Sequence, residues 1–167
     1  MRDGVVLRAD VYRPAGKGSW PVLLARTCYG KTSWVVWVDP VGTAGEGYAV
    51  VVQDIRGNFA SDGEYFPFFS DIEDGYDTVE WCAAQPWSDG KVGMFGSSAV
   101  AYTQLLAALA KPPHLVAIAP FQTWSSFGRG CVFDPSGALS LYTQEWVLLQ
   151  AVDRALMMCS MRREPLR

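Results

Sequence analysis

The sequence predicts an α/β fold with a mostly parallel sheet and helices on both faces of that sheet. Short apolar runs recur along the chain, and such runs are typical of strands buried on both faces. Two helical patterns separate the last three of these runs, as expected for crossover connections between parallel strands. The chain has 167 residues, of which 50% are hydrophobic, so we expect one domain with a sizeable core.

Five strands are expected. Residues 5–12 alternate apolar and polar side chains up to Arg13 and Pro14, which predicts a half-buried, antiparallel strand near an edge. The remaining strands are continuous apolar runs at residues 21–25, 48–54, 91–95 and 115–119.

Helices are expected between and after these strands. The helix predicted over 71–84 has an acidic first turn, which suits the positive N-terminal end of a helix. The helix predicted over 98–110 begins directly after a strand and is ended by Pro112. Apolar patterns also predict helical structure over 34–44 and 138–158.

Composition and charge exclude several classes of function. A net charge of −3 and a charged fraction of 19% give no electrostatic footprint for nucleic acid or an anionic membrane. No run of about 18 apolar residues is present, so no membrane span is expected. The N-terminus lacks the apolar core of a signal peptide, which favours a cytoplasmic protein with reduced thiols. A single histidine and four scattered cysteines argue against a zinc site, and no cofactor is expected.

The residues that carry chemistry lie where the strand at 91–95 meets the following helix. Gly96, Ser97 and Ser98 join the two without a spacer, as a nucleophile elbow requires. Ser98 is preferred over Ser97 because only Ser98 has a glycine two residues before it. Val100 stands where the Gly-x-Ser-x-Gly pattern ends in glycine, and a serine that merely caps the helix remains an alternative.

Six stretches together resemble one family. They are MRDGVVLRADVYRP (1–14), GYAVVVQDIRG (47–57), SDGE (61–64), DGYDTVEW (74–81), QPWSDGKVGMFG (85–96) and HLVAIAP (114–120). Over about residues 1–145 the chain resembles the cocaine esterase and X-Pro dipeptidyl-peptidase (CocE/NonD) family of α/β-hydrolases. The resemblance implies a three-layer α/β-hydrolase fold, truncated here before the C-terminal strands. It divides the chain into core (1–136), the start of a helical cap (137–160) and an irregular tail (161–167).

The resemblance also implies a set of site residues. Ser98 would be the nucleophile, and the oxyanion hole would be formed by the Ala99 backbone N–H and the Tyr29 hydroxyl. A tyrosine hydroxyl is a suitable donor to an oxygen that gains charge, although Tyr29 also fits as a packing aromatic. The family usually has tyrosine directly after the serine, so Ala99 keeps the N–H but loses a ring that shapes the pocket.

His114 is the only histidine in the chain, and its predicted place argues against a role as the catalytic base. The helix before it has about 12 residues and is roughly 18 Å long at 1.5 Å per residue. It carries the chain from the catalytic edge of the sheet back to the opposite edge. In the family, the triad acid and histidine follow a helical cap, and Asp134 and Asp153 come too early to be the acid. The chain is therefore expected to be a fragment or truncated product without its triad Asp and His.

The resemblance implies a serine acyl hydrolase acting on a small-molecule ester or amide, with esters, X-Pro peptides and β-lactam side-chain amides all within the family. The alternative is a degenerate, non-catalytic domain kept for interactions or as a relic, and self-association through exposed apolar edges is expected. Four aromatic side chains could line an acyl pocket or belong to the core: Trp34, Trp37, Trp124 and Phe127. A phosphate loop around Gly30-Lys31-Thr32 is disfavoured because Ala25 replaces its first glycine.

Overall fold

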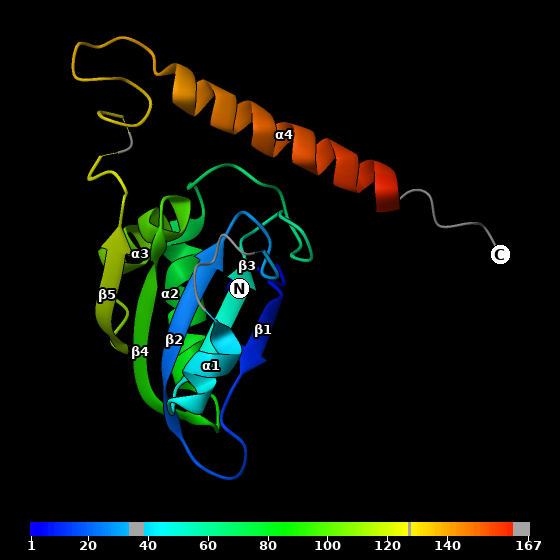
Figure 1. Cartoon of the computed structure of the whole chain (residues 1–167), viewed down its shortest axis with the longest axis vertical. Coiled ribbons are helices and arrows are strands. Elements are labelled where there is room, and N and C mark those ends of the chain that lie inside the picture. The colour runs from blue at the N-terminus through cyan, green and yellow to red at the C-terminus, as the bar shows by residue number, and fades with distance from the viewer. Residues whose placement is uncertain (34–38, 127, 162–167) are drawn as a thin grey trace, which may run out of the picture. The chain divides into compact units, whose positions relative to one another are not determined.

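The computed structural model describes residues 1–33, 39–126 and 128–161, and its first part is built around a five-stranded sheet (Figure 1). The chain divides into two compact units, Met1–Thr123 and Trp124–Arg167. The elements are β1 (Ala9–Tyr12), β2 (Trp20–Thr27), α1 (Pro40–Gly45), β3 (Ala49–Asp54), α2 (Asp71–Ala83), β4 (Ser88–Ser97), α3 (Ala99–Leu109), β5 (Leu115–Phe121) and α4 (Leu141–Met161).

The sheet has the strand order β1-β3-β2-β4-β5. β1 pairs antiparallel with β3, while the other three pairings are parallel, so the predicted mostly parallel sheet with an antiparallel edge strand is confirmed. β1 is shorter than the predicted 5–12. The preceding residues bond to a loop instead: the Asp62 amide donates to Val6 O at 3.0 Å, and the Arg8 amide donates to Ser61 Oγ at 2.9 Å.

Helices cover both faces of the sheet, as predicted. All six residues of β3 are buried, because successive side chains point to opposite faces and each face is packed. Ala49 and Val51 pack in one cluster with Val79 of α2, whereas Val50 and Val52 belong to a second cluster on the other face. Figure 1 shows α2 and α3 behind the sheet and α1 in front of it. Strand ends that carry functional loops are therefore fixed by a core on both sides.

The second unit contains α4, which covers most of the helix predicted over 138–158. Before it, Phe133 forms isolated bridges with Arg129 and Leu139. The predicted divisions at 136 and 160 stay predictions. Trp34, Trp37 and Phe127, much of the predicted 34–44 helix and nearly all of the predicted tail lie outside the described residues. No helix in the described part of the chain is long and apolar enough to cross a membrane.

Candidate active site

The elbow predicted around Ser98 has the backbone geometry of a strained turn. β4 ends at Ser97 and α3 begins at Ala99, so Ser98 alone connects them. Ser98 has φ 57° and ψ −126°, a region that non-glycine residues rarely adopt. Ser98 is half-buried, while Ser97 is only 7% exposed. The strained turn therefore presents Ser98, rather than Ser97, at the carboxyl end of β4.

Small residues around Ser98 make the turn possible. Gly96 has φ 134°, and a Cβ there would collide with Cγ1 of Val100. Val100 thus fills the space beside Gly96 even though it replaces the last glycine of the motif. Ala99 and Ala101 are buried where α3 starts. The combination of positive φ and close contact explains why glycine stands at position 96.

The side chain of Tyr29 reaches Ser98 from the loop after β2. Its hydroxyl oxygen lies 3.5 Å from Ser98 Oγ, and both side chains are half-buried. Ala99 is the first residue of α3, where backbone N–H groups have no acceptor within the helix and the helix dipole is positive. The structure therefore brings the three predicted site residues, Ser98, Tyr29 and Ala99, to one edge of the sheet.

The loop that carries Tyr29 is tied to its surroundings by one contact that is short-range in sequence and two that are long-range. The Tyr29 amide donates to Thr27 Oγ1 at 3.0 Å. The Lys31 amide donates to Asp54 Oδ1 at 2.7 Å, and Lys31 Nζ pairs with Asp10 at 2.8 Å. Sequence reasoning missed Asp54, although its position as the polar last residue of an apolar strand was a usable signal.

His114 lies at the opposite end of the sheet from Ser98, as predicted. The Val92 amide donates to His114 O at 2.9 Å, which places His114 beside the start of β4. From Val92 to Ser97 the strand extends about 17 Å at roughly 3.3 Å per residue. His114 Nδ1 instead lies 2.8 Å from Glu80 Oε2. The one histidine of the sequence therefore cannot accept the Ser98 proton.

Cys28 is a second potential nucleophile beside Tyr29, but its environment makes it inert. The side chain is buried, and burial raises the pKa of the Cys28 thiol far above its ordinary value. A thiol reacts as the thiolate, so this shift suppresses its reactivity. Among the described residues, no group of three or more His, Cys, Asp or Glu side chains is placed to hold a metal ion.

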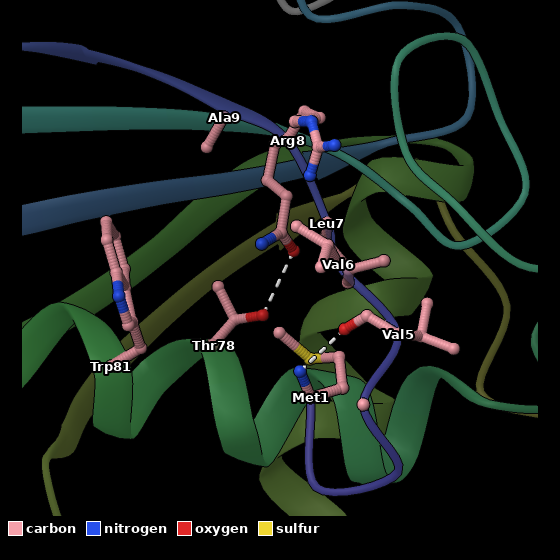
Figure 2. Close-up of a pocket in the computed structure, with 10 residues that line it drawn as sticks. Met1, Val5, Val6, Leu7, Arg8, Ala9, Thr78 and Trp81 are labelled. Atoms are coloured by element: carbon pink, nitrogen blue, oxygen red, sulfur yellow. Dashed lines mark hydrogen bonds between the residues drawn. The ribbon is translucent and has the colours of Figure 1, made fainter.

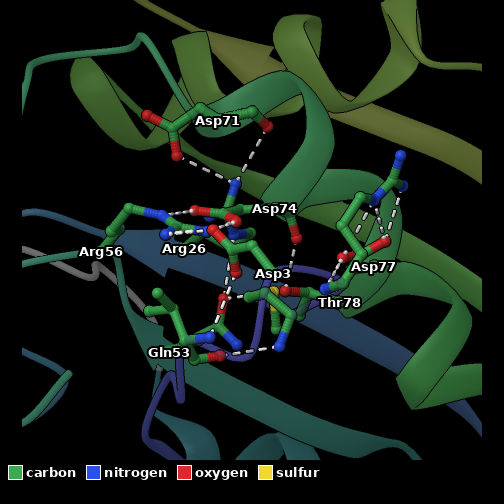
Figure 3. A network of polar contacts seen from close by, with 11 residues as sticks. Asp3, Arg26, Gln53, Arg56, Asp71, Asp74, Asp77 and Thr78 are labelled. Atoms are coloured by element: carbon green, nitrogen blue, oxygen red, sulfur yellow. Dashed lines mark hydrogen bonds and ion pairs between the residues drawn. The ribbon is translucent and has the colours of Figure 1, made fainter. Parts of the chain in front are cut away.

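A buried polar network supports the strands that lead into the site (Figure 3). Arg26 is fully buried on β2, with Nη1 at 3.0 Å from Asp71 Oδ1 and Nε donating to Gln53 Oε1 at 2.9 Å. Thr78 Oγ1 donates to the same Gln53 oxygen at 3.0 Å. Burial raises the pKa of Asp71, and the Arg26 charge acts against that rise. The backbone oxygen of Arg26 also accepts a bond from Thr103 Oγ1 of α3 at 3.2 Å.

A second row of ion pairs joins α2 to the N-terminal segment (Figure 3). Arg56 Nη2 lies 2.6 Å from Asp74 Oδ1, and Arg56 Nη1 lies 2.7 Å from Asp3 Oδ2. Hydrogen bonding to Arg56 lowers the pKa of Asp3. Arg2 and Asp77 pair at 2.6 Å, and this hydrogen bond lowers the pKa of Asp77. The buried network around Arg26 and the ion pairs of Arg56 and Arg2 together attach α2 to the rest of the first unit.

A cavity beside β1 is separate from this site (Figure 2). It is lined by the N-terminal segment together with Gln53, Thr78 and Trp81. Several of its polar groups bond to each other or to the N-terminal segment: Thr78 bonds to Gln53, and the Met1 ammonium donates to Val5 O at 2.7 Å. The Ser98 edge, where a strained serine lies beside the Tyr29 hydroxyl, is therefore the stronger candidate for an active site.

Comparisons with known proteins agree on one family. A model of the X-Pro dipeptidyl-peptidase (S15) family matches residues 3–163. The cocaine esterase of Rhodococcus sp. (strain MB1 Bresler) is 44% identical over 151 residues, covering 84% of this chain and 25% of the esterase.

Solved structures give the same picture. A CocE/NonD family hydrolase from Staphylococcus aureus has a TM-score of 0.65 and 34% identity over 71% of this chain and 25% of that one. An aminopeptidase from the marine sediment archaeon Thaumarchaeota archaeon has a TM-score of 0.66 and 28% identity over 74% and 24%. The chain thus spans about a quarter of the length of these relatives.

Proposed function

The chain belongs to the X-Pro dipeptidyl-peptidase (S15) family, and on that premise we propose that it carries the nucleophile and oxyanion hole of a serine acyl hydrolase. Over the part it spans, its fold is that of the α/β-hydrolases. The observation that carries the proposal is the Tyr29 hydroxyl at 3.5 Å from Ser98 Oγ on a strained elbow.

In the proposed reaction Ser98 Oγ attacks the carbonyl carbon of an ester or amide while its proton passes to a base. The negative charge that develops on the carbonyl oxygen receives hydrogen bonds from the Tyr29 hydroxyl and the Ala99 N–H. Collapse of this intermediate expels the alcohol or amine and leaves an acyl group on Ser98, which water then removes. Because His114 lies at the far end of the sheet, it cannot take this proton, and the reaction needs a different base.

The substrate class follows from the reaction and from the relatives. An oxyanion hole built from a phenol and an amide serves esters and amides equally, because both pass through a tetrahedral intermediate. The relatives include a cocaine esterase and an aminopeptidase. We therefore propose a small-molecule ester or a peptide or side-chain amide as substrate.

Covalent labelling tests this proposal. A serine hydroxyl reacts slowly without a base, so the chain is incubated with a fluorophosphonate and a high concentration of imidazole. We expect mass spectrometry to locate the adduct on Ser98. Ser98→Ala should abolish it, and Tyr29→Phe should lower the labelling rate about 10²–10³-fold because one oxyanion donor is lost. Ser97→Ala is the matched control and should be labelled like the wild type. Labelling of the wild type on Ser97, or an unchanged rate in Tyr29→Phe, would contradict the proposal.

The second candidate is a non-catalytic interaction domain, which the exposed edge strand favours. In the described sheet β5 pairs only with β4, and its Val116 and Phe121 side chains are 62% and 51% exposed. β5 carries no charged residue that would discourage pairing with another chain.

We propose that the chain self-associates through β5. Light scattering after size-exclusion chromatography should then give the mass of a dimer. Val116→Lys should give monomers, while Val41→Lys on α1 should not. A wild-type chain that stays monomeric at high concentration would rule this out.

A further inference from the structure

Asp54 occupies a position that links two loops at the catalytic edge of the sheet. It is the last residue of β3, and its side chain is almost completely buried, with the residue 1% exposed. One carboxylate oxygen, Oδ1, accepts the Lys31 amide at 2.7 Å. The other, Oδ2, accepts the Ala60 amide at 3.3 Å. Each oxygen therefore holds a different loop, one after β2 and one after β3.

The two loops also contact each other directly beside Tyr29. Phe59, which precedes Ala60, has φ 49°, and its ring lies 3.0 Å from where a Cβ on Gly30 would be. Gly30 has φ 92°, so both the backbone and the space favour glycine there. A left-handed phenylalanine persists only where its surroundings hold it. The Asp54–Ala60 bond is one of the contacts that does so.

Resting on the proposed function, we propose that Asp54 is a positioning residue of the oxyanion hole. Its carboxylate holds the loop of Tyr29 through the Lys31 amide and the Phe59 loop through the Ala60 amide, so that the phenol faces Ser98. An ionised carboxylate is suited to this task because both of its oxygens accept. An asparagine would turn an NH₂ group toward one of the two amides and lose that bond.

Asp54→Asn and Asp10→Asn separate this role from general support of the loop. Asp10→Asn removes the charge that pairs with Lys31 Nζ but leaves the buried amide bonds intact. The first readout is the rate of fluorophosphonate labelling in imidazole. The second is the ¹³Cζ signal of Tyr29 in tyrosine-labelled protein, assigned with Tyr29→Phe. The signal of Tyr76, on α2, reports an intact fold.

We expect Asp54→Asn to slow labelling about 10²-fold, the cost of a misplacement near 1 Å, and to shift the Tyr29 signal. Asp10→Asn should leave both unchanged. The proposal is overturned if Asp54→Asn labels at the wild-type rate with an unmoved Tyr29 signal, or if Asp10→Asn has the same effects. Should Asp54→Asn unfold, Asp54→Glu, which keeps both acceptors but displaces them, must show the same shift and slowing or the proposal fails.

The two proposals can fail separately. If wild-type chain is not labelled on Ser98, the proposed function fails. The Tyr29 signal still tests the role of Asp54 in that case, because it does not depend on the reactivity of the serine. If Ser98 is labelled but Asp54→Asn changes neither readout, only the positioning role is lost.

Discussion

The 167-residue chain is expected to hydrolyse p-nitrophenyl acetate no faster than its Ser98→Ala variant. Ser98 is the proposed nucleophile, but the one histidine of the sequence bonds to Glu80 at the other end of the sheet. Loss of the histidine from such a triad lowers the rate about 10⁶-fold, because acylation and deacylation both need the base. The measurement is the release of p-nitrophenol at equal protein concentration for the two chains.

An active serine esterase assayed in parallel shows that the substrate and conditions are adequate. A wild-type rate well above that of Ser98→Ala would contradict the expectation. It would mean that a side chain of this sequence other than His114 takes the Ser98 proton. Equal rates, combined with covalent labelling of Ser98 in imidazole, would show that the nucleophile is present and the base is what the chain lacks.

Asp71→Ala is expected to lower the free energy of unfolding by about 3–5 kcal/mol. Its carboxylate lies 3.0 Å from a guanidinium nitrogen of Arg26, and both residues are buried. Removing one partner of such a pair leaves the other as an uncompensated buried charge, which has no water to solvate it. The remaining hydrogen bonds of Arg26, to Gln53 Oε1 and to the backbone oxygen of residue 71, do not neutralise that charge. Urea unfolding followed by circular dichroism measures the difference.

The matched control for this experiment is Asp62→Ala. Asp62 pairs with Arg8 at 3.8 Å, and both side chains are about half exposed. Exposed pairs contribute about 0–1 kcal/mol because water and salt screen them. If Asp71→Ala and Asp62→Ala lower the free energy of unfolding equally, the Arg26–Asp71 pair does not act as a buried charge pair.

The sheet could be predicted largely from local patterns. The apolar runs of β3 and β5 and the junction of β4 with α3 are visible in consecutive residues, because buried parallel strands are apolar throughout. The beginning of β1 was predicted wrongly, since residues 5–8 have the right alternation but bond to the loop at Ser61 and Asp62. An alternating pattern shows which side chains are buried, but it does not show whether the backbone bonds to a neighbouring strand or to a loop.

The site could be predicted in part. Gly96 and Ser98 are two residues apart, and the strained turn they form is a local feature that a motif records. The distant partners of Arg26 and Asp54 were not predictable, because Asp71 and the Lys31 amide reach them only through tertiary packing between segments far apart in the sequence. A buried arginine in an apolar strand and an aspartate at a strand end were the available signals. Neither one identifies its partner.

The most direct test of the central claim is a crystal structure of the chain after reaction with the fluorophosphonate. The account predicts phosphorus bonded to Ser98 Oγ, with one phosphonyl oxygen about 2.7–3.1 Å from both the Tyr29 hydroxyl and the Ala99 nitrogen. An adduct on Ser98 whose oxygen points away from Tyr29 and Ala99, or phosphorus attached to a different residue, would contradict it.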